Sequence, residues 1–158
     1  FRQRKTMIKI PLTRGKFAII DDEDFKLVSH LKWSFASAGY AISRFPNYGK
    51  LVLMHRIILG AKKGQSVDHK NGNGLDNRKS NIRLCSHKQN MMNRKKPSHN
   101  TSGYKGVTWD KQMKKWRVQI RHSETNSYIG LFKNIIDAAN AYDKKAKEIF
   151  GEFARLNF

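Results

Sequence analysis

The chain has 158 residues, and its 32 Lys and Arg against 12 Asp and Glu give a formal net charge of +20. Such an excess predicts a polyanionic partner, because each cation placed at a phosphate releases a condensed counterion. The apolar content of 39% argues against global disorder, and the single cysteine, Cys85, excludes an internal disulfide and a Cys-rich zinc site. No apolar run approaches the roughly 18 residues of a membrane span. No basic amphipathic helix carries a large apolar face either, so nucleic acid is favoured over a membrane surface.

The first third of the chain predicts short strands and one short helix. Two β-rich runs, 7–11 and 16–20, flank a turn-like Thr-Arg-Gly and predict a hairpin. Acids at 21–24 precede apolar residues at every third position, which predicts a short helix. Strand-like segments follow at 33–36, 40–44 and 51–55, with a turn at Asn47-Tyr48-Gly49 between the last two. Met7 is the expected natural start, which would make residues 1–6 an upstream remnant.

The sequence pattern changes twice in the rest of the chain. A Gly/Asn-rich loop at 71–74 separates short apolar pieces near Val67 and at 82–84, and a capping box of Ser86 with Gln89 predicts a helix to about Asn93. The basic, polar residues from 94 to 102 resemble a linker. Three strand patterns follow, and then a helix that begins at the N-cap Asn134 and ends at Gly151.

One group of polar residues has the side chains that a metal-dependent catalytic site needs. Asp68 and His69 end a strand, the loop turns back, Asn81 opens the next strand, and the following helix carries Asn90. Asp68 and Asn90 offer two hard oxygen ligands, which suit Mg²⁺ or Mn²⁺. His69, beside a ligand in the sequence, can take a proton from water.

These residues resemble the HNH nucleases with a ββα-metal motif, in the phage and intron homing-endonuclease branch. Met54-His55-Arg56 also matches a His-Arg pair of that branch, and the similarity covers about residues 7–93. The resemblance implies that His69 is the general base, that Asp68 and Asn90 bind one divalent metal, and that Asn81 holds the loop and orients the histidine.

Several residues near this motif allow more than one interpretation. His55 and Arg56 are candidate DNA contacts, although His55 is also a candidate core or capping histidine. We interpret Asp76-Asn77 as a turn rather than a ligand pair, because Asp and Asn are frequent turn formers.

The C-terminal third carries an alternating strand. Residues 116–121 place Trp116, Val118 and Ile120 on one face, and Arg117, Gln119 and Arg121 on the other. The second face offers groups that pair with phosphates and base edges. A solvated polar face is the alternative, but eleven Lys or Arg against one acid between residues 83 and 121 favour DNA binding.

Residues 102–158 resemble the plant ethylene-response-factor (Apetala-two) DNA-binding domain. The matching stretches are Tyr104 to Val107, Lys115-Trp116 through Arg121, Tyr128 to Phe132, Ala138 to Asp143, and Leu156 to Phe158. The family uses a three-stranded sheet in the major groove with a helix behind it. Thr108, Gln119 and Tyr128 depart from the plant pattern, so the plant target sequence does not transfer. The predicted DNA contacts here are Lys105, Thr108, Arg117, Gln119, Arg121 and Tyr128.

We therefore expect an α+β protein with two domains: an HNH nuclease domain at 7–95 with an N-terminal strand-rich lobe, a linker at 96–101, and an Apetala-two-like domain at 102–158. The expected function is metal-dependent, homing-type cleavage of double-stranded DNA, with no membrane and no obligate protein partner. The resemblance implies the cytoplasm of a phage-infected or bacterial cell, in association with the nucleoid. A non-catalytic DNA-binding regulator with a decayed nuclease lobe and an RNA-binding protein are the alternatives.

Overall fold

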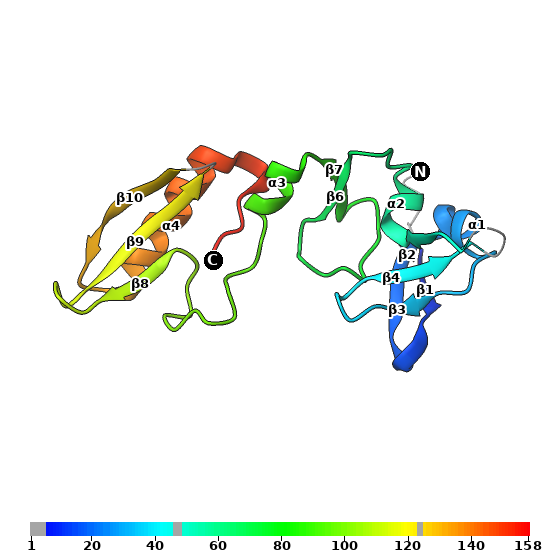
Figure 1. Cartoon of the computed structure of the whole chain (residues 1–158), viewed down its shortest axis with the longest axis horizontal. Coiled ribbons are helices and arrows are strands. Elements are labelled where there is room, and N and C mark those ends of the chain that lie inside the picture. The colour runs from blue at the N-terminus through cyan, green and yellow to red at the C-terminus, as the bar shows by residue number, and fades with distance from the viewer. Residues whose placement is uncertain (1–5, 46–48, 123–124) are drawn as a thin grey trace. The chain divides into compact units, whose positions relative to one another are not determined.

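A computed structural model describes residues 6–45, 49–122 and 125–158. Within it the chain folds as two compact units, Phe1–His87 and Lys88–Phe158 (Figure 1). The fold is mixed α and β, with small antiparallel sheets in both units. This agrees with the α+β class expected from the sequence. Among the described residues, no helix combines the length and apolar character that a membrane span requires.

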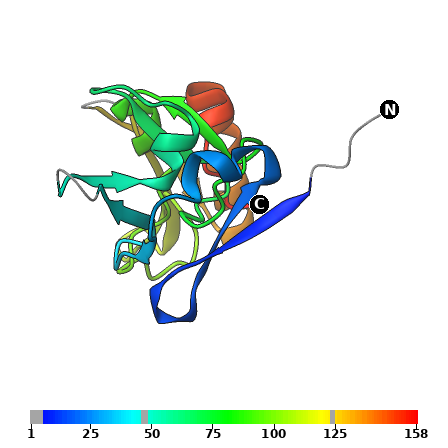
Figure 2. The ribbon, with the colours of Figure 1, turned by 90° about the vertical axis from the view of Figure 1, so that its right-hand side faces the viewer.

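The first unit begins with the expected hairpin. Strands β1 (Met7–Pro11) and β2 (Phe17–Asp21) pair antiparallel, with Met7 opposite Asp21. Figure 2 shows this hairpin, in dark blue, as a two-stranded ribbon. The turn Asp22–Asp24 and the short helix α1 (Phe25–Val28) follow, as the acids ahead of a helical apolar pattern predict.

A three-stranded sheet comes next, and it corrects one prediction. Its strands, in spatial order, are β3 (Ser34–Phe35), β4 (Ala41–Arg44) and β5 (Leu51–Leu53). The strand expected at 51–55 ends at Leu53, and residues Met54–Ile58 form helix α2 instead. Burial overrides strand propensity here, because a helix lets Met54, His55 and Ile58 all turn inward. The turn expected at Asn47-Tyr48-Gly49 includes residues 47 and 48, which lie outside the described residues.

The candidate catalytic segment is a second hairpin followed by a helix. Strands β6 (Ser66–His69) and β7 (Ile82–Cys85) pair antiparallel, with His69 opposite Ile82. Helix α3 (His87–Met92) starts where the Ser86 capping box predicts. The core of the first unit draws on nearly every element before α3. Its buried members are Ile10, Leu12, Ala18, Ile20, Val28, Leu31, Trp33, Ala41, Met54, Ile58, Val67 and Ile82.

The second unit is a three-stranded antiparallel sheet packed on one helix. The strands are β8 (Val107–Asp110), β9 (Lys115–His122) and β10 (Thr125–Phe132), with β9 in the centre. Helix α4 (Ile135–Phe150) is capped by Asn134, whose side chain accepts from the backbone N–H of Ile136, and it ends at Gly151. Both caps agree with the prediction.

Small residues let α4 lie close to the sheet. Ala138, Ala139 and Ala146 are fully buried against Val118 and Ile120 of β9. Gly106, just before β8, serves the same close packing: a Cβ there would fall on the ring of Tyr142 and 2.7 Å from the carbonyl oxygen of Gln119. Its φ of +75° also disfavours any side chain.

We therefore expect Gly106→Ala to destabilise the second unit by about 1–3 kcal/mol from overpacking, with a further cost of about 1 kcal/mol for the left-handed backbone. Gly103→Ala is the matched control, because Gly103 shares a positive φ of +81° but its Cβ would meet only the Lys96 Nζ, at 4.0 Å. Hydrogen exchange of the β9 amides reports the opening free energy of this unit alone. Equal protection in the two variants would contradict the packing argument.

Candidate active site

The end of β6 presents the two residues that the sequence singled out. Asp68 and His69 are each 4% exposed. Burying a carboxylate and an imidazole is costly unless neighbouring groups pair with them. The partners of both side chains therefore define the site.

Asp68 pairs with an arginine on the opposite strand. The register places Arg83 of β7 directly across from Asp68. Its Nε and Nη2 both donate to Asp68 Oδ2, at 2.9 and 2.7 Å, and the arginine side chain is only 12% exposed. This fork sets the orientation of the Asp68 carboxylate.

His69 lies in a cluster of buried rings. Its ring centroid is 4.9 Å from that of His55, nearly edge to face at 86°, and 5.8 Å from that of Tyr40. Burial lowers the pKa of His69, an effect that a hydrogen bond from the ring to Asn77 and the charge of Asp68 oppose in part. Burial, with the charges of His69 and Arg56, lowers the pKa of His55 to about 3. Both imidazoles are therefore neutral at neutral pH.

Asn81 ties together the segment between the two strands, which we call the β6–β7 loop (residues 70–81). The Asn81 side-chain oxygen accepts from the backbone N–H of Asn71 at 3.1 Å, and its Nδ2 donates to the carbonyl of Asp76 at 2.7 Å. The backbone N–H of Lys70 also donates to the Asn81 carbonyl, at 2.9 Å. One asparagine thus bonds to both halves of the loop.

Strand β2 also holds the β6–β7 loop, through backbone hydrogen bonds. The backbone N–H of Ile19 donates to the Leu75 carbonyl at 2.8 Å, and the N–H of Asn77 donates to the Ile19 carbonyl at 2.7 Å. Within the loop, Arg78 donates two hydrogen bonds to the carboxylate of Asp76, which lowers the pKa of Asp76. The loop is therefore an ordered part of the unit despite its glycines.

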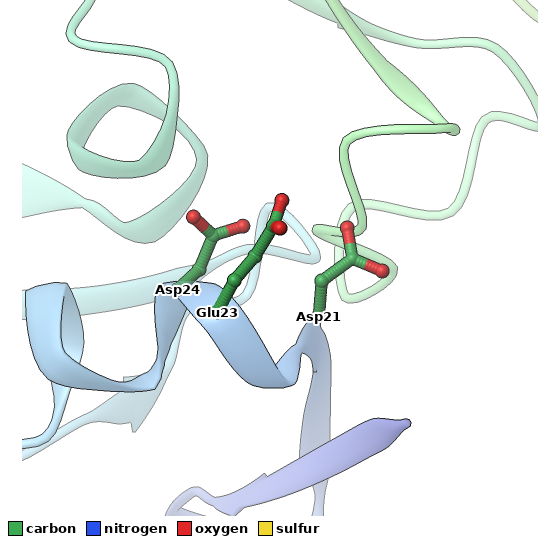
Figure 3. Close-up of side chains that lie close together, drawn as sticks. All are labelled: Asp21, Glu23 and Asp24. Carbon is green, nitrogen blue, oxygen red and sulfur yellow. The ribbon is translucent and has the colours of Figure 1, made fainter. Parts of the chain in front are cut away.

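Three acids at the end of β2 and in the turn that follows it provide a further anchor (Figure 3). Oxygens of Asp21, Glu23 and Asp24 lie within 4.8 Å of one another. The Lys79 Nζ lies 3.0 Å from Glu23 and 2.7 Å from Asp24, and its backbone N–H donates to Asp21 at 2.8 Å. Hydrogen bonds to Asp24 and Glu23 raise the pKa of Lys79. A lysine from the β6–β7 loop thus pairs with two of the acids through its ammonium and with the third through its backbone N–H, which gives the cluster a structural role.

The remaining predicted residues of the nuclease motif are distributed as follows. Arg56 donates to the carbonyls of Gln65, Ala61 and Lys62, and so holds the turn ahead of β6. His55 is 5% exposed and its Nδ1 has no hydrogen-bond partner among the described residues. Asn90 lies on α3, within the second compact unit.

The outer face of the second unit's sheet carries most of the predicted DNA contacts. Val118 and Ile120 are buried while Arg117, Gln119 and Arg121 are exposed, as the alternation predicts. The register sets Thr108 beside Arg117 and Tyr128 beside Gln119, and both partners are exposed. We call the five residues Thr108, Arg117, Gln119, Arg121 and Tyr128 the sheet face.

Two of the predicted contacts have partners within the unit. Arg117 forms an ion pair with Asp110. Lys105 lies outside the sheet face: its Nζ donates to the Met92 carbonyl at 2.9 Å, and burial, with the nearby Arg155 and Arg94, lowers its pKa to about 8. Lys105 therefore has a structural contact that the sequence did not indicate.

Comparison with known proteins places this sequence in a family. A family model described as HNH endonuclease matches residues 52–92. Protein 3.8 of Escherichia phage T7 is 33% identical over 94 residues, which cover 60% of this chain and 77% of that protein. An uncharacterized HNH endonuclease of Acanthamoeba polyphaga mimivirus is 30% identical over 149 residues, 91% of this chain and 76% of its own length.

The chain belongs to the HNH endonuclease family. The C-terminal part is similar to a plant protein as well: dehydration-responsive element-binding protein 2A of Oryza sativa is 34% identical over 67 residues, 39% of this chain and 23% of that protein. This HNH endonuclease is therefore a fusion of a nuclease with an Apetala-two-like region. No solved structure shows a significant match to it.

The geometry of this HNH endonuclease includes residues that sequence reasoning missed. Asn77 was interpreted as a turn former, yet it is fully buried and contacts His69. Tyr40 and Arg83 also touch the central pair. Strand pairing between Asp68 and Arg83 was a usable signal once the hairpin was predicted, whereas nothing local marks Tyr40 as a neighbour of His69.

The buried histidine pair predicts acid sensitivity. The pKa of His55 is about 3 in the folded chain and near 6.5 in the unfolded chain. Between these pH values the unfolded chain therefore binds a proton at His55 that the folded chain does not bind. Stability should therefore fall as the pH drops below 6.5, by about 1.4 kcal/mol per unit for this group. We expect the free energy of unfolding to fall less between pH 7.5 and pH 4.5 in His55→Leu than in the wild type. Denaturant titration at each of the two pH values measures this fall.

An exposed histidine of the same unit supplies the control. His30→Gln changes the histidine count of the unfolded chain as His55→Leu does, but it touches no buried ring. A His55→Leu profile that parallels the wild type down to pH 4.5 would show that His55 is not the group concerned.

Proposed function

We propose that this HNH endonuclease hydrolyses phosphodiester bonds of double-stranded DNA in a reaction that requires a divalent metal ion, with His69 as general base. The observation that carries the proposal is the pair Asp68 and His69, buried at the end of β6 and enclosed by a loop that Asn81 and β2 hold in place. Family membership supplies the nuclease activity.

The state of His69 suits the role of a base. A general base must be unprotonated at the working pH and still be able to take a proton from water. Burial lowers the pKa of His69, which favours the unprotonated ring, while the hydrogen bond to Asn77 and the charge of Asp68 act in the opposite direction. Asn81 contributes indirectly, because it fixes the loop that begins directly after His69.

The donor set fits a hard divalent cation. Asp68 brings a carboxylate that Arg83 orients, and the resemblance adds the amide oxygen of Asn90, so both ligands are oxygens of the kind that Mg²⁺ and Mn²⁺ prefer. Bound there, the ion would supply charge stabilisation at the departing 3′ oxygen. The domain boundaries 7–95, 96–101 and 102–158 belong to the same proposal, since they keep Asn90 with the nuclease motif.

Double-stranded DNA is the substrate that the surface supports best. The net charge of +20 favours a polyanion. The sheet face adds two exposed arginines and an amide on one strand, groups that suit the major groove. His55 and Arg56 act within the nuclease unit in this proposal, and Lys105 supports the fold around the sheet. The similarity to a protein of an Escherichia phage supports a setting in a phage-infected bacterial cell, and homing-type cleavage is part of the same proposal.

Cleavage should require Mg²⁺ or Mn²⁺, because the proposed ligands are oxygens. The measurement is nicking and linearisation of supercoiled plasmid by chelator-treated protein, with each metal added back. Asp68→Asn should need a higher metal concentration for the same rate. Full activity in chelator, or zinc that stays bound in a one-to-one ratio after dialysis against chelator, would contradict the proposal.

His69→Ala should lower the cleavage rate by roughly 10²–10⁴-fold, the usual contribution of general base catalysis. DNA affinity, measured by gel shift without added metal, should change little, because a ring that is 4% exposed offers almost no contact surface. His87→Ala is the matched control, since His87 is an exposed histidine at the start of α3. Cleavage by His69→Ala at the wild-type rate would refute the assigned base.

Arg121→Ala should weaken DNA binding by about 1–3 kcal/mol at one preferred sequence if the guanidinium reads a guanine. If it contacts phosphate alone, binding should weaken evenly across sequences and the salt dependence should fall by about one counterion. Lys144→Ala removes the same charge from the exposed side of α4 and is the control. An equal loss of affinity in the two variants would show that the sheet face is not the contact surface.

A further inference from the structure

Asn77 is a fully buried polar side chain in the β6–β7 loop, with 0% of its surface exposed. Its backbone is anchored to β2 through the hydrogen bond to Ile19. Its Nδ2 lies 3.4 Å from the Leu75 carbonyl and 3.4 Å from Met54 Sδ, and its Oδ1 lies 3.1 Å from Nε2 of His69. A turn alone does not explain this burial, because turn-forming asparagines function equally well in solvent.

The partners of the amide determine which way round it lies. The Leu75 carbonyl can only accept a hydrogen bond, so the Asn77 NH₂ group must face it. The Asn77 oxygen then faces His69, and an oxygen acceptor at 3.1 Å requires that Nε2 of the neutral ring carries the hydrogen. The ring lone pair is consequently on Nδ1.

We propose that Asn77 is a positioning residue for catalysis: it holds His69 in the Nε2–H tautomer and fixes the plane of the ring, so that Nδ1 is the proton-accepting atom. This inference rests on the proposed role of His69 as the base. The rings of His55 and Tyr40 pack against His69 and restrict how far it can tilt. Asn77 sets the tautomer of His69, and the backbone hydrogen bond from Asn77 to Ile19 of β2 holds the amide in place.

Three variants separate positioning from structure. Asn77→Leu keeps the side-chain volume and removes the acceptor, Asn77→Asp keeps an acceptor oxygen toward Nε2, and Met54→Leu removes the sulfur contact of Asn77 while leaving the His69 contact intact. Single-turnover cleavage of plasmid at saturating DNA with Mg²⁺ measures the chemical step, and gel shift measures affinity.

We expect Asn77→Leu to cut the single-turnover rate by roughly 10- to 100-fold, part of the whole contribution of a general base, with DNA affinity unchanged. Asn77→Asp should recover most of that rate, and Met54→Leu should stay within a few-fold of wild type. A folded Asn77→Leu enzyme at the wild-type rate, or a Met54→Leu enzyme equally impaired, would overturn the proposal.

A measurement on the unmodified protein keeps the proposal testable even if Asn77→Leu fails to fold. Long-range ¹H–¹⁵N correlation spectra distinguish the two neutral tautomers of a histidine, and the His69→Ala spectrum identifies the signals of His69. We expect the Nε2–H tautomer at neutral pH, and the Nδ1–H tautomer would overturn the inference. Wild-type cleavage by His69→Ala would instead refute the proposed base, whatever the tautomer.

Discussion

The arrangement of the active site depends on one constraint: the β6–β7 loop must hold a single conformation although it is rich in glycine and asparagine. Backbone groups in such a loop have many ways to bond with water, and ordering them has an entropic cost. The cost is met by polar bonds that run to other parts of the unit. Asn81 bonds to both halves of the loop, Ile19 pairs with its middle, and Lys79 is held by Asp21, Glu23 and Asp24.

This constraint explains how a very basic chain uses its few acids. Of the 12 Asp and Glu, many accept hydrogen bonds inside their own unit instead of facing solvent. Among the described residues, the acids with buried side chains are Asp21, Asp24, Asp68, Asp76, Asp110 and Asp143. Asp143, for example, accepts from the backbone N–H groups of Asn157 and Phe158 and so fastens the C-terminal residues to α4. Since the acids are turned inward, the surface is left with most of the positive charge, and the same residues that order the fold leave a surface suited to a polyanion.

Regular elements with a clear period could be predicted from the sequence, and contacts between distant segments could not. The alternation of β9 and the capped helix α4 follow from local patterns, and the pair Asp68 and His69 was visible because the two residues are adjacent. Helix α2 was missed because Met54–Ile58 is only five residues long, has no side-chain cap and follows a strand-like run. Asn77 was interpreted as a turn former because its neighbours Asp76 and Gly74 suggest nothing else. Its contact with His69 exists only after β2 and the β6–β7 loop come together, which no local pattern records.

The residues proposed for catalysis and those proposed for DNA binding also differ in how the fold holds them. Asp68, His69 and Asn77 are buried and multiply bonded, so each can be placed accurately but can add little area to a DNA interface. Gln119, Arg121 and Tyr128 are exposed on a regular sheet, where long or planar side chains can adjust to a groove. Accurate placement matters for a proton transfer, which tolerates only small errors in distance and angle, whereas adjustable contacts matter for affinity. Burial thus separates the residues proposed for catalysis from those proposed for recognition, and this separation follows from the requirement that the β6–β7 loop be fixed from within.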